Sequence, residues 1–152
     1  DVRLAELLLA RGAAVEAEDE RGVRPLASAA RAGRTELCRM LLGARAQVDA
    51  AQADTEKTAL VFAAGVGNAE VCSVLLAAKA SPEARAATGA TAIHAAAANG
   101  HGSVCTLLLD ARANPSDAGP GGQDAVSLAR AAGHATLADT LAGGGGPPEA
   151  AS

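Results

Sequence analysis

The sequence predicts an all-α solenoid, in which short helix-turn-helix units stack on one another and are joined by hairpin-like turns. Three observations support this fold class. The chain of 152 residues matches itself when it is shifted by 33 or 34 positions. Its residues are 49% hydrophobic, yet they include one Phe and neither Trp nor Tyr. Each repeat contains two apolar segments separated by a glycine.

The register of the repeat follows from residues that recur at steps of 34, 33 and 33. Three such series are Leu26, Leu60, Ile93 and Val126; Gly33, Gly67, Gly100 and Gly133; and Leu41, Leu75, Leu108 and Leu141. The one extra residue falls in the connector 50–55, where a change of length costs little. A core of Ala, Leu and Val is thin, because small side chains fill only the narrow space between closely packed helices. We therefore expect stacked units.

Within each unit the pattern predicts two helices of about two turns each, such as PLASAARAG followed by TELCRMLLGA. The glycine between them marks a tight turn. Pro25 suits the first turn of a helix, and Thr58, Thr91 and Asp124 stand where an N-cap belongs. Arg24 takes that place in the first full unit and cannot cap in the same way. Polar stretches between units, such as ATG and DAGPGG, predict projecting turns.

We expect one domain over residues 2–142, followed by a flexible Gly/Pro tail over 143–152. The domain divides into a partial unit, three full units and a shorter C-terminal capping unit. Their ranges are 2–19, 22–50, 56–84, 89–117 and 122–142.

Two stretches copy the repeat most closely: GATAIHAAAANGHGSVCTLLLDARANP from Gly89 to Pro115, and EKTALVFAAGVGNAEVCSVLLAAKASP from Glu56 to Pro82. They resemble the ankyrin repeat, whose pattern runs roughly GxTPLHxAAxxGHxxVVxLLLxxGAxxN. The resemblance covers residues 2–141. It implies an ankyrin-repeat solenoid whose function is to bind another protein, with no cofactor and no catalytic site of its own.

The chain departs from that pattern after its second helices. The family usually has Gly there, in a left-handed backbone conformation, and Gly12 keeps it while Arg45, Lys79 and Arg112 do not. A residue with a Cβ in that conformation costs roughly 1 kcal/mol or more, so we expect a stack less stable than a consensus array. The weak last unit has Arg130 where the family usually has Ala, which suits a polar solenoid end.

Three cysteines invite a zinc hypothesis, but Cys38, Cys72 and Cys105 are separated by the repeat itself. Neighbouring units stack about 8 to 10 Å apart, whereas zinc holds each sulfur at about 2.3 Å. We therefore expect buried, reduced thiols that act as small apolar fillers on the second helices, with neither metal nor disulfides. Reduced thiols fit an intracellular, cytoplasmic location.

The histidines also have structural roles in the family pattern. His94 takes the place of the family's TPLH histidine, and the resemblance implies that its ring bonds to backbone between units. His101 and His134 follow the turn glycine, as in the family's GH pair. None has a nucleophile and an orienting acid beside it in sequence, so we predict no catalytic residues and no enzyme activity.

Other ligand chemistries are disfavoured. The stretches 119–122 and 143–146 match no phosphate-binding glycine motif, and the acidic residues at 16–20 lack the spacing of a calcium loop. A net charge of -4 with no basic run argues against nucleic acid. No apolar stretch reaches the roughly 20 residues that span a bilayer, so no membrane insertion is expected. We expect a monomer.

The resemblance places a binding surface on the hairpin tips and the exposed side of each first helix. Carried onto this chain, the partner-binding residues are Glu18, Glu20, Arg21, Val23, Arg31, Asp54, Lys57, Val66, Arg85, Thr88 and Asn99. Without Trp or Tyr we expect an affinity on the order of micromolar, with Arg21, Arg31 and Lys57 as the best candidates.

Two functions stay open on the sequence alone. One is a protein–protein interaction module, or scaffold, that binds its partner through the concave face. The alternative is an architectural or docking segment of a larger multidomain protein, such as an enzyme. Fold alone does not decide between them.

Overall fold

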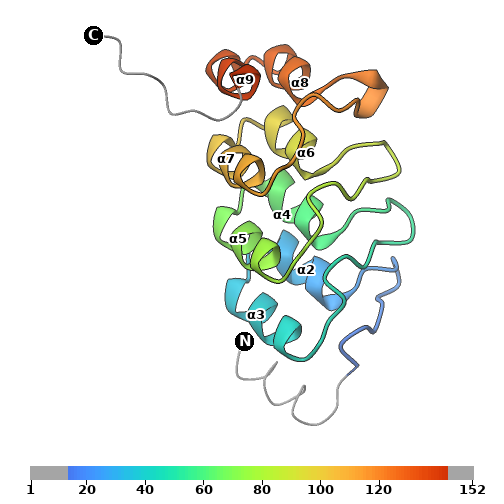
Figure 1. The fold of residues 1–152 in the computed structure, drawn as a ribbon. Helices are drawn as coiled ribbons and strands as arrows, with labels where there is room; N and C mark the ends of the chain where they lie inside the picture. The colour runs from blue at the N-terminus through green and yellow to red at the C-terminus, as the bar shows by residue number, and fades with distance from the viewer. Residues whose placement is uncertain (1–13, 144–152) are drawn as a thin grey trace.

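The computed structural model describes residues 14–143, which form a stack of antiparallel helix pairs (Figure 1). Residues 2–13 of the predicted partial unit, with Gly12, and residues 144–152 of the predicted tail lie outside the described range. Eight α-helices occupy that range: α2 (Pro25–Arg31), α3 (Thr35–Gly43), α4 (Ala59–Val66), α5 (Ala69–Ala77), α6 (Ala92–Ala98), α7 (Gly102–Asp110), α8 (Ala125–Ala131) and α9 (Ala135–Ala142).

The helices form two layers. The first helices α2, α4, α6 and α8 contact one another in that order, and α3, α5 and α7 form the neighbouring layer in the same way. The connectors between units project to one side of the stack (Figure 1). Residues 14–143 contain no β-strand, and a single short 3-10 helix (Pro120–Gly122) lies in the last connector. The predicted all-α solenoid is confirmed.

The predicted N-caps are confirmed. The side chain of Thr58 accepts the N–H of Val61, and that of Asp124 accepts the N–H of Ser127. Thr91 begins α6 with a capping box, in which its own N–H donates to a ring nitrogen of the third helical residue. Arg24 makes no side-chain cap, and the helix there begins with Pro25 at its first turn.

The glycines between the paired helices lie in tight turns, as predicted. Their backbones are left-handed, with φ of 67°, 78°, 75° and 87° at Gly33, Gly67, Gly100 and Gly133. A second constraint acts at Gly67. A Cβ there would lie 2.5 Å from the ring of His101, which belongs to the next unit. The His101 ring instead packs over the bare glycine, and its Nε2 lies 3.2 Å from the carbonyl oxygen of Gly65. The predicted structural role of this histidine is confirmed.

The core between the layers is thin and made of small side chains. Pairs of alanines on the first helices are almost fully buried, and the leucine series of the second helices is at most 3% exposed. Val126, the last member of its series, is only partly buried because no described unit stacks beyond α8 and α9. The buried leucines are Leu41, Leu75, Leu108 and Leu141.

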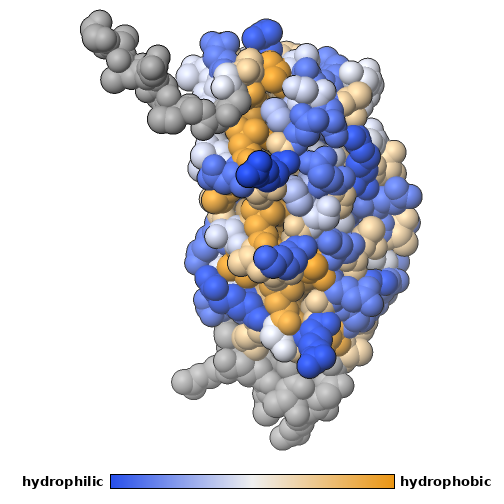
Figure 2. Space-filling view, viewed as in Figure 1, coloured by the Kyte–Doolittle hydropathy of each residue, from blue (hydrophilic) through white to orange (hydrophobic). Residues whose placement is uncertain are grey.

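The sequence repeat is also visible on the outer surface. Figure 2 shows a band of hydrophobic residues that runs along the stack over the second-helix layer, bordered by hydrophilic residues. Leu42, Leu76 and Leu109, at equivalent places on α3, α5 and α7, are partly buried and pack against the core. The band follows from the same repeat that builds the interior.

The inserted residue lies within one hairpin. In three connectors the paired backbone groups are four residues apart, for example Asp19 N–H with Val23 O. In the second connector, Gln52 N–H donates to Lys57 O, five residues on. The extra residue is therefore absorbed by this hairpin, as the sequence predicted, and Glu56 adopts a φ of 53° at a place where the other units have Gly.

A ladder of three carboxylates joins successive loops of the stack, as far as the loop after α7. At each step an acidic side chain accepts a backbone N–H of the following loop, which satisfies a donor that this loop cannot satisfy by itself. The bonds join Glu16 to Gln47 (2.7 Å), Asp49 to Ser81 (2.9 Å) and Glu83 to Asn114 (3.1 Å).

The first prediction concerns the three non-glycine residues with left-handed backbones. Arg45, Lys79 and Arg112 have φ of 68°, 69° and 69°, and their side chains are exposed, so a change to Gly relieves strain without loss of packing. Each single substitution should raise the free energy of unfolding by about 0.5 to 1 kcal/mol in denaturant titrations.

The preceding residue of each loop provides the matched control. Ala44, Ala78 and Ala111 all have φ of -81°, so a change to Gly there should lower stability through added freedom of the unfolded chain. The changes to Gly at Arg45, Lys79 and Arg112 should not lower the denaturant midpoint as well. If they do lower it, left-handed strain at these residues does not reduce the stability of the stack.

The second prediction concerns thiol reactivity. Cys38, Cys72 and Cys105 are at most 1% exposed, and burial raises the pKa of Cys38 and Cys105 to about 11 and that of Cys72 to about 12. Because only thiolates react, labelling by a thiol reagent should be slow under native conditions and should reach all three cysteines only in concentrated guanidinium chloride. Rapid labelling of the folded protein would contradict the burial.

Candidate functional site

The first helices and their hairpins enclose two adjoining hollows, of about 440 and 510 Å³. Both are lined by Arg31 at the end of α2 and by Phe62 on α4, so they form one continuous depression, which we call the concave groove. The first hollow is lined by Asp19, Arg21, Val23, Ala27, Ser28, Arg31, Ala32 and Phe62. The second is lined by Arg31, Lys57, Val61, Phe62, Gly65, Val66, Thr88, Ala90, Ala95 and Asn99.

Phe62 forms the apolar wall between the two hollows. It is the one aromatic residue of the chain, and it is partly buried on α4. Val66, one helical turn further on, is 50% exposed and is the most exposed large apolar side chain among residues 14–143. The two side chains share a helix face because they are four residues apart. An apolar partner group therefore has a surface to pack against.

Our sequence-based set of binding residues missed Phe62. A signal was available, because Phe62 lies four residues before Val66, which the sequence placed on the exposed side of this helix. The small residues at the equivalent places in neighbouring units, Ser28 and Ala95, leave room around the ring.

The groove is also basic. Lys57 Nζ lies 5.7 Å from the centroid of the Phe62 ring, within the range of a cation–π contact. Arg31 stands between the hollows, and Arg21 lines the first of them. Among the residues that the structure describes, Arg21, Arg31 and Lys57 form no ion pair. Arg21 and Arg31 are exposed, and Lys57 is partly buried.

The carboxylate that shares this groove, Asp19, is engaged by its own hairpin. Its Oδ1 accepts the N–H groups of Arg21 and Val23, each at 2.9 Å. These bonds, first that from Val23 and then that from Arg21, lower the pKa of Asp19 below its ordinary value. Asp19 therefore holds the turn that presents Arg21 to the groove.

Seven of the eleven residues predicted from the sequence line the groove. They are Arg21, Val23, Arg31, Lys57, Val66, Thr88 and Asn99. Glu20 and Asp54 are exposed on the hairpins outside it. Glu18 is paired with Arg24, at 3.0 Å, a contact that the sequence did not suggest.

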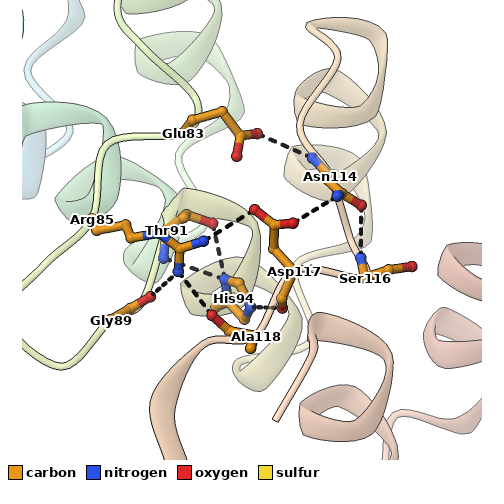
Figure 3. Close-up of polar contacts among 9 residues, drawn as sticks. All are labelled: Glu83, Arg85, Gly89, Thr91, His94, Asn114, Ser116, Asp117 and Ala118. Atoms are coloured by element: carbon orange, nitrogen blue, oxygen red, sulfur yellow. Dashed lines mark hydrogen bonds and ion pairs between the residues drawn. The ribbon is translucent and has the colours of Figure 1, made fainter. Parts of the chain in front are cut away.

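Arg85 also lies outside the groove, in a polar network between two hairpins (Figure 3). One nitrogen of its guanidinium donates to the carbonyl oxygens of Gly89 (3.0 Å) and Ala118 (2.8 Å), and another pairs with the Asp117 carboxylate at 3.0 Å. The Asp117 carbonyl oxygen lies 2.9 Å from Nε2 of His94. Arg85 thus links its own hairpin to the next one.

His94 is the buried centre of that network. It is 1% exposed, and its Nδ1 accepts the Thr91 N–H at 3.3 Å, which leaves Nε2 to donate to the Asp117 carbonyl oxygen. This contact confirms the expected bond to backbone between units. Every donor and acceptor position of the ring is occupied within the chain, so the ring is structural.

Within residues 14–143, no three His, Cys, Asp or Glu side chains gather closely enough to ligate a metal ion. No helix in that range has both the length and the apolar character needed to cross a membrane.

The comparison with protein families gives one match. The family model described as ankyrin repeats (3 copies) matches residues 1–86 and again 46–119, which together span residues 1–119 of the 152. The pair α8 and α9 lies beyond both matches, whereas the sequence resemblance extends as far as residue 141. No curated protein matched the chain.

The third prediction concerns the pH dependence of the hairpin that presents Arg21. Because the pKa of Asp19 is lowered in the folded state, its carboxylate stabilises the fold above the unfolded pKa of about 3.9, and this contribution is lost as the pH falls through the folded pKa. D19N should therefore be less stable than the wild type near neutral pH, and the difference should shrink below about pH 4 in denaturant titrations.

E20Q is the matched control, because it removes the neighbouring charge while leaving the Asp19 bonds in place. It should change stability less than D19N near neutral pH. A difference between wild type and D19N that persists or grows in acid would show that the Asp19 carboxylate does not stabilise the hairpin.

Proposed function

The chain belongs to the ankyrin-repeat family, and from that premise we propose that its concave groove binds a partner protein. Ankyrin repeats generally act as protein–protein interaction modules and are typically not enzymes. The groove fits this use, because it combines an exposed apolar wall on α4 with cations on α2 and on the hairpins ahead of α2 and α4.

The main support for this proposal is that Phe62 and Val66 lie together in a groove that cationic side chains surround. Single exposed apolar residues are common on any surface and need no explanation. Here the most exposed large one of the described part lies beside the sole aromatic residue, in a hollow of about 510 Å³. Interfaces depend on such anchors, surrounded by polar groups that set the orientation of the partner.

The solenoid form supports distributed contact. The groove takes residues from three consecutive units, through Arg31 on α2, Lys57 ahead of α4 and Asn99 after α6. Residues that recur every 33 or 34 positions lie in rows along the stack, so one partner touches several units at once. We therefore propose Arg21, Arg31, Lys57 and the apolar pair of α4 as the principal contacts.

The four predicted residues that lie outside the groove contribute less to binding than those within it. Arg85 and Glu18 already have charged partners in the chain, so a partner protein gains little from them. Glu20 and Asp54 stand on exposed hairpins, where they contact a partner at the rim.

The fourth prediction tests the groove by charge reversal. Partners are captured on the full chain and identified by mass spectrometry, and affinities are then measured by calorimetry with purified proteins. R21E/R31E/K57E should weaken binding by more than about 2 kcal/mol, roughly 30-fold in Kd, because cationic groups that face the partner become repulsive. The melting midpoint should change little, since exposed charges contribute little to folding.

R39E/K79E/R112E is the control of equal charge. Each triple reversal changes the net charge of -4 by -6, to -10, so general repulsion is the same in both. Arg39, Lys79 and Arg112 are exposed outside the groove. If this control abolishes binding while the groove variant retains full affinity, the partner binds another face.

A further inference from the structure

We infer that the concave groove recognises an acidic segment of its partner, one in which an apolar side chain is flanked by carboxylates. This inference rests on the proposed function and adds the chemistry of the ligand. It follows from the arrangement of three features within the groove: the apolar wall, the cations around it and the acidic remainder of the chain.

The apolar wall sets the first requirement. Phe62 and Val66 line the second hollow, and the rest of its apolar lining comes from Val61, Gly65, Ala90 and Ala95. Its volume of about 510 Å³ has room for a branched or aromatic side chain, and packing against Phe62 and Val66 removes apolar area from water on both sides. A purely polar segment would leave this wall without a partner.

The cations set the second requirement. Arg31, Lys57 and Arg21 contribute three positive charges to the groove, against the single carboxylate of Asp19. That carboxylate already accepts two backbone N–H groups, so it neutralises the arginines only in part. The groove is therefore basic within a chain of net charge -4.

The net negative charge of the chain does not cancel this local field. Charges on the far side of the stack are screened beyond about 8 Å at physiological ionic strength. An acidic segment thus meets a favourable local potential in the groove, where three cations lie together, and this potential favours binding to this face.

The distance between the apolar wall and the cations defines the sequence motif expected in the partner. Lys57 Nζ lies 5.7 Å from the Phe62 ring centroid, so its charge sits at the edge of the apolar wall. Successive residues of an extended chain are about 3.3 to 3.6 Å apart. A carboxylate one or two positions from the apolar residue therefore reaches Lys57 or Arg31 while that residue contacts Phe62.

The experiment selects ligands without assuming a partner. Random peptides of about 12 residues, long enough to cross several units when extended at about 3.3 Å per residue, are displayed on phage and selected on the full chain. The enriched sequences should contain Leu, Ile, Val or Phe with Asp or Glu one or two positions away. Enrichment of basic or uncharged sequences would overturn the inference.

Synthetic copies of an enriched peptide then test the geometry by fluorescence anisotropy. R31E/K57E should weaken binding at least about 10-fold, and V66D should do the same by placing a charge on the exposed wall. R39E/K79E, with the same change of net charge, should leave affinity within about twofold. A peptide in which Lys replaces every acidic residue should bind R31E/K57E more tightly than it binds the wild type, because the charge pattern is exchanged on both sides.

The outcomes separate this inference from the proposed function. If enriched peptides lack acidic residues but lose binding in V66D, the groove binds proteins and the acidic motif is wrong. If the enriched peptides bind R31E/K57E and V66D as tightly as the wild type, both the motif and the groove assignment fail. A single-stranded oligonucleotide that binds the wild type and is released by R31E/K57E, with no peptide enriched, would overturn the acidic-protein ligand.

Discussion

Close approach between neighbouring first helices is the constraint on which the rest of this structure depends. No unit can cover its own apolar face, so each needs a neighbour packed against it. The facing positions must then be small, and Ala30, Ala63, Ala64, Ala96 and Ala97 are all fully buried between adjacent helices. The lack of large aromatic residues in the core is a consequence of this spacing.

Because the helices stand so close, the polar groups at their ends must be satisfied by the next unit. The carboxylate ladder, the buried His94 and the bond from His101 to Gly65 all cross between units. In residues 14–143 no buried side-chain nitrogen or oxygen lacks a partner. The joints between units are thus polar and directional, while the layers themselves are apolar, and together they hold the hairpins in register.

That rigid spacing is what makes a shared groove possible. Side chains on the exposed side of α2, α4 and α6 do not contribute to the interior, so their identity is free to serve recognition. Phe62 and Lys57 are examples, since each lines the groove at a place where neighbouring units have small or different residues. The one aromatic side chain of the chain lies where a partner can reach it and outside the core.

The sequence alone determined the repeat, the helix pairs, the caps at Thr58, Thr91 and Asp124, and the left-handed backbone at Arg45, because these depend on local residue types and on a period visible along the chain. It also named seven of the residues that line the groove. Only the tertiary structure decided that Arg85 bonds to the next hairpin and that Phe62 joins two hollows. The directions of these side chains are set by neighbours some 30 residues away, and a local pattern contains no information about them.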